Sequence, residues 1–389
     1  MEKQYAIVGM GNAGGQVANL AEKKYPELFE CIYINTSEAD LSMINTSSEY
    51  KFKIGDKEEI EGAGKNRTKM KNYFHDAIPK ILGDAKLQEC FSTKKYIFVV
   101  SSAAGGTGSG AAPMFVKYLQ MACRDAHIIL IGILPNMNAS MLEQGNTMEF
   151  LHEVYNILGE STTYMFYDNE STADLPPTEA LEVVNDNIVE DLRVLTGVDN
   201  FSTPYESIDE ADMENIITTP GRLLVTRITK GLTEKNMEDS DLSDIIIKNI
   251  KKSCHVETDR NKKVVRWGII TYFTDSVNRL YSAQLDKVQD FIGIPVERFN
   301  HNAINKSTEN TNFMYLIFSG LSPINDRSVK IKNKIDEINN NLAKDETNKF
   351  IFADESYSTN ETRKKFETKE VGPMDSFDGD AIFRMFMKD

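Results

Sequence analysis

The sequence has few cysteines and no long apolar run. Its four cysteines, Cys31, Cys90, Cys123 and Cys254, show neither CxxC spacing nor a pairing pattern. We therefore expect reduced thiols and assign no metal ligand. The longest apolar stretch, residues 128–134, is far too short to span a bilayer. Because a strand pattern begins at residue 4, we expect no signal peptide and a cytoplasmic location.

Positive charge is scarce relative to negative charge. Lys and Arg number 44 against 59 Asp and Glu, so the net charge is −15. Broad contact with DNA needs clustered basic side chains to neutralise phosphates, which argues against direct nucleic-acid binding. If this protein acts on DNA, an adaptor must make the contact. The 389 residues are enough for a sizeable core and more than one domain.

A glycine-rich segment provides the strongest functional signal. An apolar run at residues 97–100 predicts a buried strand, and a helical pattern follows the segment. Glycines let a backbone approach a ligand with its N–H groups pointing inward, and a helix N-terminus adds positive potential. Such a loop suits a polyphosphate, although a structural turn is the alternative. Its residues are Gly105, Gly106, Thr107, Gly108, Ser109 and Gly110.

A second glycine loop follows the strand predicted at residues 4–8. Gly9, Gly11 and Gly14 satisfy GxGxxG, the dinucleotide fingerprint, so a nicotinamide dehydrogenase is an alternative. Two observations count against it. The strand at residues 31–34 is followed by Asn35-Thr36-Ser37, without the acid that would hold a ribose hydroxyl. A dehydrogenase also has no use for a second phosphate loop.

The two loops together resemble the tubulin/FtsZ family of GTPases. AGGTGSG at residues 104–110 is similar to the family signature GGGTGTG, with Ala104 replacing the first glycine. GNAGGQV at residues 11–17 resembles the first nucleotide loop, and INTSEADL at 34–41 resembles the second, with Ser37 replacing its acid. The resemblance implies bound GTP or GDP with Mg²⁺. It also implies that the nucleotide is contacted by the glycine-rich segment and by Gly11, Asn12, Ala13, Gly14, Gln16, Ala63 and Gly64.

Three further nucleotide contacts follow from chain order within the resemblance. Glu143 lies where FtsZ carries PFxFEGxxR and is assigned to the ribose, although that motif is absent here. Asn169 follows the strand predicted at residues 163–167, and Asn185 lies in VVND where FtsZ has AAND. Both are assigned to guanine, because an amide offers a donor and an acceptor together.

An acidic pair follows a long predicted helix at residues 180–195, for which Thr178 is the expected cap and Leu181 part of the apolar face. SIDEAD at residues 207–212 corresponds to the family motif NxDxxD, with Ser207 replacing the asparagine. Asp209 and Asp212 match the two acids and share a helix face, so both are expected to point at one target. In the family these acids reach the γ-phosphate of the next subunit. The alternative is a solvated turn that caps a helix.

We predict an α/β fold: a doubly wound parallel-sheet GTPase domain (1–177), a central helix (178–198), a smaller α+β domain with a mixed sheet (199–355) and a tail (356–389). Helices are expected at 67–82, 114–122, 241–253, 276–292 and 328–342, and strands at 127–134, 264–274, 311–318 and 349–352. The apolar end of the tail, residues 380–387, either docks on the protein or serves as a handle for a partner.

The resemblance implies a GTPase that polymerises head to tail, because a heterologous contact that does not close gives an open filament. Divergence from FtsZ and eukaryotic tubulin favours the TubZ branch, plasmid and phage tubulins that segregate DNA through a DNA-binding adaptor. The alternatives are another divergent prokaryotic tubulin, used in phage positioning, cell shape or division, a NAD-dependent oxidoreductase, and a monomeric binding protein. No direct nucleic-acid or membrane contact is expected.

Overall fold

The computed structural model describes residues 3–46, 48–55, 64–197, 203, 207–239, 242–256, 263–280, 285–306 and 311–344. Residues 1–332 form one compact unit, and residues 333–389 form a second, in which the described part is helical. Three predictions lie outside the described residues: Ala63, the strand at 349–352 and the tail at 356–389.

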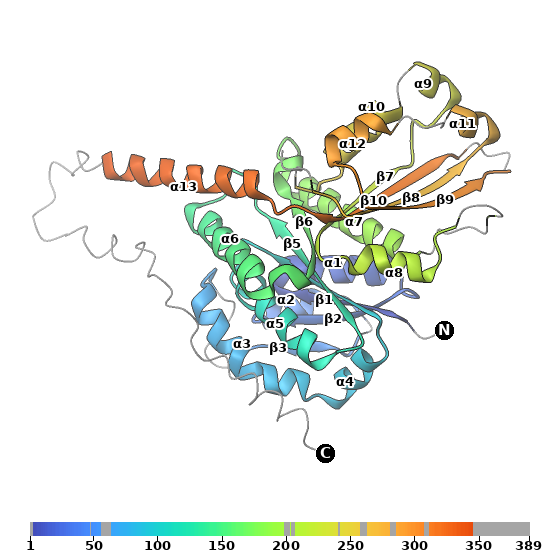
Figure 1. The fold of residues 1–389 in the computed structure, drawn as a ribbon. Coiled ribbons are helices and arrows are strands. Elements are labelled where there is room, and N and C mark those ends of the chain that lie inside the picture. Colours follow the sequence, from blue (N-terminus) through green and yellow to red (C-terminus); the bar gives the residue numbers. More distant parts are fainter. Residues whose placement is uncertain are drawn as a thin grey trace, which may run out of the picture. The chain divides into compact units, whose positions relative to one another are not determined.

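Within the described residues, ten strands form one sheet (Figure 1). Their order across the sheet is β3-β2-β1-β4-β5-β6-β7-β10-β8-β9. The strands are β1 (Tyr5–Met10), β2 (Phe29–Asn35), β3 (Lys51–Lys53), β4 (Tyr96–Ser102), β5 (His127–Leu134), β6 (Thr163–Asp168), β7 (Gly221–Ile228), β8 (Arg266–Phe273), β9 (Glu297–Ile304) and β10 (Phe313–Leu321).

The first six strands pair in parallel, in the 3-2-1-4-5-6 order of a doubly wound sheet. β7 continues the parallel pairing with β6, and β10 then pairs antiparallel with β7 and β8. The predicted fold class, a parallel sheet followed by a mixed one, is confirmed. In such a sheet the crevice for a ligand lies at the carboxyl ends of β1 and β4, where the strand order reverses.

Helices cover both faces of the sheet. They are α1 (Gly11–Lys24), α2 (Glu38–Met43), α3 (Arg67–Leu82), α4 (Ala85–Ser92), α5 (Thr107–Ala122), α6 (Met141–Glu153), α7 (Pro177–Leu195), α8 (Glu210–Thr218), α9 (Glu234–Asp239), α10 (Leu242–Lys252), α11 (Asp275–Leu280), α12 (Asp286–Ile292) and α13 (Asn325–Lys344). Short turns η1 (Val154–Leu158), η2 (Gly159–Ser161) and η3 (Asn169–Thr172) surround β6.

Alternation along the strands divides the core into two layers. Ile7, Val100 and Ile131 belong to a cluster that α1, α7 and α8 complete. The intervening residues face the opposite side, where α3, α5 and α6 lie beside the parallel strands and α10 and α11 pack on β7 and β8 (Figure 1). Burial on both faces explains why β1, β4 and β5 are nearly continuous apolar runs.

A buried polar network ties the central helix α7 to the sheet. Asp191, 2% exposed, accepts hydrogen bonds from Tyr167 of β6 (2.9 Å) and Arg227 of β7 (2.7 Å). The carboxylate oxygen of Asp191 that accepts from Tyr167 also lies 3.1 Å from Nε2 of His255. Burial beside Asp191 raises the pKa of Tyr167, which keeps its hydroxyl a donor. The helix is thereby fixed to both the parallel and the mixed parts of the sheet.

Several local predictions were wrong. α7 begins at Pro177 after Pro176, so Thr178 is not its cap, and proline suits a first helical turn because its N–H would be unpaired there anyway. Leu181 is 48% exposed rather than on the buried face. The helix expected at 276–292 is two helices, α11 and α12. β3, β7 and β9 were not predicted. β3 and β9 are edge strands with little apolar alternation, whereas β7 is a buried central strand.

The partly buried His127 makes stability depend on pH. Its Nε2 lies 3.1 Å from Thr163 Oγ1, and burial lowers the pKa of His127 to about 4. The unfolded chain, with a pKa of about 6.5, takes up this proton first as the pH falls. We expect His127 to remove about 1–3 kcal/mol from the free energy of unfolding between pH 6.5 and pH 4. Urea denaturation of His127→Gln should show a smaller loss over this range.

His75→Gln is the control, since His75 is exposed, and it should keep the pH dependence of the wild type. An unchanged pH dependence in His127→Gln would contradict the assignment.

Candidate nucleotide site

The two glycine loops meet at the carboxyl ends of β1 and β4. These strands are parallel neighbours, with Met10 paired to Ser101. A Cβ atom on Gly14 would lie 2.1 Å from the carbonyl oxygen of Val100, and one on Gly108 would lie 2.6 Å from that of Met10. Neither distance leaves room for a side chain, so glycine is required here by close backbone approach.

Two helices begin in these loops. α1 starts at Gly11, and α5 starts at Thr107, earlier than the helix predicted after Pro113. The first N–H groups of a helix have no intrahelical partner and carry positive potential, so the two helix starts suit an anion. Thr107 Oγ1 lies 2.8 Å from Thr36 Oγ1, which brings the second predicted loop to the same place.

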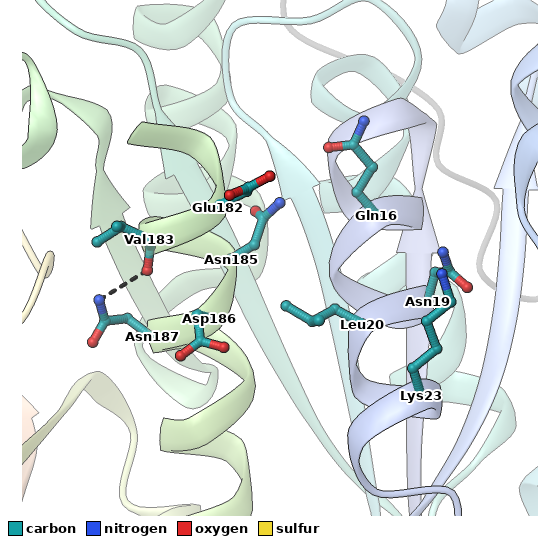
Figure 2. A pocket seen from close by; sticks show the side chains of 9 residues that line it. All are labelled: Gln16, Asn19, Leu20, Lys23, Glu182, Val183, Asn185, Asp186 and Asn187. Atoms are coloured by element: carbon teal, nitrogen blue, oxygen red, sulfur yellow. Dashed lines mark hydrogen bonds between the residues drawn. The ribbon is translucent and has the colours of Figure 1, made fainter. Parts of the chain in front are cut away.

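Two predicted nucleotide contacts, Gln16 and Asn185, line one pocket between α1 and α7, whereas Asn169 does not line it. The pocket has a volume of about 630 Å³, within the range of small-molecule sites. Figure 2 shows Gln16 on α1 and Asn185 on α7 at its opposite sides. The remaining lining residues are Asn19, Leu20, Lys23, Glu182, Val183, Asp186 and Asn187. Amide and charged side chains dominate this wall, which suits a polar heterocycle. Gln16 also donates to Asn12 Oδ1 (3.2 Å).

Asn169 presents an unpaired acceptor next to this region. It begins η3, which packs against the start of α7. Among the described residues, nothing donates a hydrogen bond to its buried Oδ1. A buried acceptor without a donor costs free energy unless a ligand or water supplies one. The Oδ1 atom of Asn169 is therefore available to a ligand donor, and the contact of Asn169 with guanine stays a prediction.

Arg327, a residue that the sequence analysis did not single out, holds the backbone beside Asn169. It is 5% exposed and forms two bonds to the carboxylate of Asp168, at 2.7 and 3.0 Å. It also donates to the carbonyl oxygen of Pro135 (2.6 Å). Burial raises the pKa of Asp168, against the opposing effect of this guanidinium. Arg327 thus joins the carboxyl ends of β5 and β6 through hydrogen bonds.

The third side of the site is the segment at residues 64–67 and helix α6. Gly64 has a φ of +54° and open space around its Cα. The ammonium of Lys65 lies 2.8 Å from a carboxylate oxygen of Glu143, whose other oxygen accepts from Ser140 in a capping box. Burial raises the pKa of Glu143, but Lys65 and Ser140 together hold it below its ordinary value. The carboxylate assigned to the ribose is already paired.

Two buried residues that the sequence analysis missed link these segments. The Nδ2 atom of Asn146 lies 3.0 Å from the carbonyl oxygens of Lys65 and Ala104 and 3.2 Å from that of Gly105. Arg67, 3% exposed, donates to Ser109 Oγ (3.0 Å). Ser109 is fully buried, so its hydroxyl faces the protein rather than solvent. Neither Asn146 nor Arg67 belongs to a recognisable motif; their roles depend on partners far away in the chain.

The acidic pair lies away from this site. Asp209 and Asp212 form a capping box at the start of α8: each carboxylate accepts from the N–H of the other, at 2.8 and 3.2 Å. This differs from the expectation that both point at one target. Glu210 of α8 pairs with Lys95, which precedes β4, whereas the glycine-rich loop follows β4. The seven residues of this strand separate the two ends by roughly 20 Å.

Two negative findings bear on the site and its surroundings. Among the described residues, no group of three or more His, Cys, Asp or Glu side chains could hold a metal ion. No helix in the described part of the chain is long and apolar enough to cross a membrane.

Comparison with known protein families finds one that part of the chain resembles. Residues 4–176 match the family model described as the Tubulin/FtsZ family, GTPase domain. The matched residues, which make up less than half of the chain, thus resemble the GTPase domain of the tubulin/FtsZ family, a class that binds GTP and GDP and hydrolyses GTP. The match favours a GTPase over the nicotinamide oxidoreductase alternative, because both glycine loops fall inside the matched region.

Several relatives within the family resemble the chain. Tubulin-like protein TubZ of Clostridium botulinum C phage is 24% identical over 43% of this chain and 45% of its own length. CetZ of Methanothrix thermoacetophila is 27% identical over 39% of each chain. FtsZ 2 of Haloferax volcanii is 26% identical over 57% of this chain and 52% of its own. The matches thus span about half or less of these curated relatives.

Solved structures extend the similarity in fold. Clostridium botulinum phage c-st TubZ superimposes with a TM-score of 0.69 at 16% identity, covering 88% of this chain and 100% of that one. A GTPγS-form protofilament of Bacillus thuringiensis serovar israelensis TubZ gives 0.67 at 16% identity, covering 88% and 94%. At this identity the likeness establishes a shared fold.

The contrast between Gly14 and Gly105 gives a test of the loop geometry. Gly14→Ala places a methyl group against a backbone carbonyl and should lower the free energy of unfolding by at least about 2 kcal/mol. At Gly105 a Cβ meets nothing within 4 Å, so Gly105→Ala should unfold at nearly the wild-type temperature. Thermal unfolding followed by circular dichroism measures both. Equal losses in the two variants would contradict the contact described here.

Proposed function

We propose that this chain binds GTP at the carboxyl ends of β1 and β4 and hydrolyses it as subunits assemble head to tail. One observation carries the proposal: the nucleotide loops and the acidic pair occupy opposite ends of β4. Within one chain the acids are too far from the loops to act on bound nucleotide. Stacking subunits in one direction brings the acids of one against the nucleotide of the next, and such a contact does not close.

In this proposal the guanine lies in the pocket between α1 and α7. The amide of Asn185 faces that pocket, and the unpaired acceptor of Asn169 supplies a partner for a base N–H group. The phosphates lie over the starts of α1 and α5, with Gly64 on the third side. Mg²⁺ binds through phosphate oxygens and water, so we assign it no protein ligand.

Asp209 and Asp212 are the proposed catalytic residues. Phosphoryl transfer to water needs an oriented nucleophile and charge stabilisation more than covalent participation. Asp209 is exposed and Asp212 partly exposed, so both carboxylates are available to a neighbouring subunit even though they also cap α8. The cap fixes the geometry of the pair before the neighbour arrives.

We further propose a division into a GTPase domain (1–177), a central helix (178–198), a second domain (199–355) and a tail (356–389). The filament serves to segregate plasmid or phage DNA through a DNA-binding adaptor. The net charge of −15 supports an adaptor, since the filament would repel bare DNA. CetZ and FtsZ 2 resemble the chain about as closely as TubZ does, so phage positioning, cell shape or division is the second candidate.

Assembly is tested by right-angle light scattering after addition of GTP and Mg²⁺ to the purified chain, with phosphate release followed in parallel. We expect scattering to rise above a critical protein concentration and to decay as GTP is consumed, whereas ATP should have no effect. Flat scattering without phosphate release would contradict the proposal.

The same assay tests the acidic pair. Asp212→Asn keeps an oxygen that can accept from the N–H of Asp209, so the capping box survives while the charge is lost. Phosphate release should fall by about 100-fold or more, with GTP still bound and filaments long-lived. Glu210→Gln is the matched control, since Glu210 is exposed and outside the pair. Wild-type turnover in Asp212→Asn would rule out the catalytic assignment.

The cellular role needs a separate test. Deleting the gene should increase loss of the DNA molecule that encodes it at each division, while cell length and division frequency stay unchanged. Stable inheritance together with altered shape or division would instead favour the second candidate.

A further inference from the structure

Asn146 joins two segments of backbone at the phosphate end of the site. It lies on α6 and is 6% exposed. Its one amide nitrogen is within hydrogen-bond distance of three carbonyl oxygens, those of Lys65, Ala104 and Gly105. Two belong to the glycine-rich loop and one to the segment at residues 64–67, so a single side chain sets the spacing between them.

The direction of these carbonyls determines where the adjoining N–H groups point. A peptide unit is planar and trans, so its C=O and N–H bonds point to opposite sides. The carbonyl of Ala104 shares a peptide with the N–H of Gly105, and the carbonyl of Gly105 shares one with the N–H of Gly106. Holding both carbonyls toward Asn146 therefore turns both N–H groups away from α6.

The space beside the Cα atom of Gly105 is open. A Cβ atom placed on Gly105 would have no neighbour within 4 Å. Among the residues that the structure describes, no backbone or side-chain oxygen accepts a hydrogen bond from the N–H group of Gly105 or Gly106. Successive N–H groups that face an open concavity form an anion-binding nest.

Asn146 is itself fixed by a buried ion pair. Arg67 donates to the backbone carbonyl of Asn146 (2.8 Å) and pairs with Glu153 of the same helix (2.8 Å). Glu153 also contacts Lys71 of α3. Because α3 and α6 are joined in this way, the amide of Asn146 is held in place before any nucleotide binds.

We propose that Asn146 is a positioning residue that aims the N–H groups of Gly105 and Gly106 at the phosphates of the nucleotide. The inference rests on the proposed GTP site and adds a residue outside its motifs. Asn146 does not touch the base pocket between α1 and α7, so its effect is specific to the phosphate part of the ligand.

Asn146→Asp is the test, because it keeps the shape but replaces the donor with an oxygen that repels the three carbonyls. Asn146→Ala removes the donor without adding charge. The dissociation constants of GTP and GDP should rise by about 10- to 100-fold in both variants. The dissociation constant of guanosine, measured by competition, should change by less than about 3-fold, because guanosine has no phosphate that the loop could contact.

Gln144→Ala is the matched control. Gln144 is a fully buried amide on the same helix, but its Nε2 donates to the carbonyl oxygen of Asn136 (2.9 Å) rather than to the phosphate loops. It should lower the unfolding temperature while leaving the ratio of guanosine to GTP dissociation constants at the wild-type value.

The outcomes distinguish failure of the proposed GTP binding from failure of the role inferred for Asn146. A wild-type chain that binds neither GTP nor GDP would remove the proposed function, and this inference with it. A wild-type chain that binds GTP while both Asn146 variants bind it equally well would overturn the inference alone. Equal weakening of guanosine and GTP would also overturn it, since the side chain would then only support the fold. If Asn146→Asp does not fold, Asn146→Ala decides.

Discussion

The candidate site depends on how closely two stretches of backbone approach each other where β1 and β4 end. Gly14 packs on the carbonyl of Val100, and Gly108 packs on the carbonyl of Met10. One methyl group at either place would push the loops apart and separate the starts of α1 and α5. Because the strands are parallel neighbours, the two helix N-termini otherwise converge, and their combined N–H groups suit a polyphosphate.

The central helix α7 connects this site to the rest of the sheet. Asn185 lines the pocket between α1 and α7, and Asp191, about 9 Å farther along the helix, anchors the buried polar network. Asn187 belongs to both regions: it lines the pocket and accepts a hydrogen bond from Arg227 of β7 (2.8 Å). A ligand that contacts α7 therefore contacts an element held by hydrogen bonds to the mixed part of the sheet.

Much of the fold could be predicted from the sequence where apolar periodicity is strong. The helix at 67–82 and the strand at 127–134 have the predicted bounds, and both glycine loops stand at the expected strand ends. The edge strands β3 and β9 were missed because they carry little apolar alternation, and the central strand β7 was missed although it is buried. Asn146, Arg67 and Arg327 were missed for a different reason. Each acts on residues 40 or more positions away, and no local pattern records such a contact.

A crystal structure of the chain with GDP tests the central claim most directly. We predict guanine between α1 and α7, within hydrogen-bond distance of Asn185, and phosphates over residues 105–108. Nucleotide bound elsewhere, or a base directed away from α7, would contradict it.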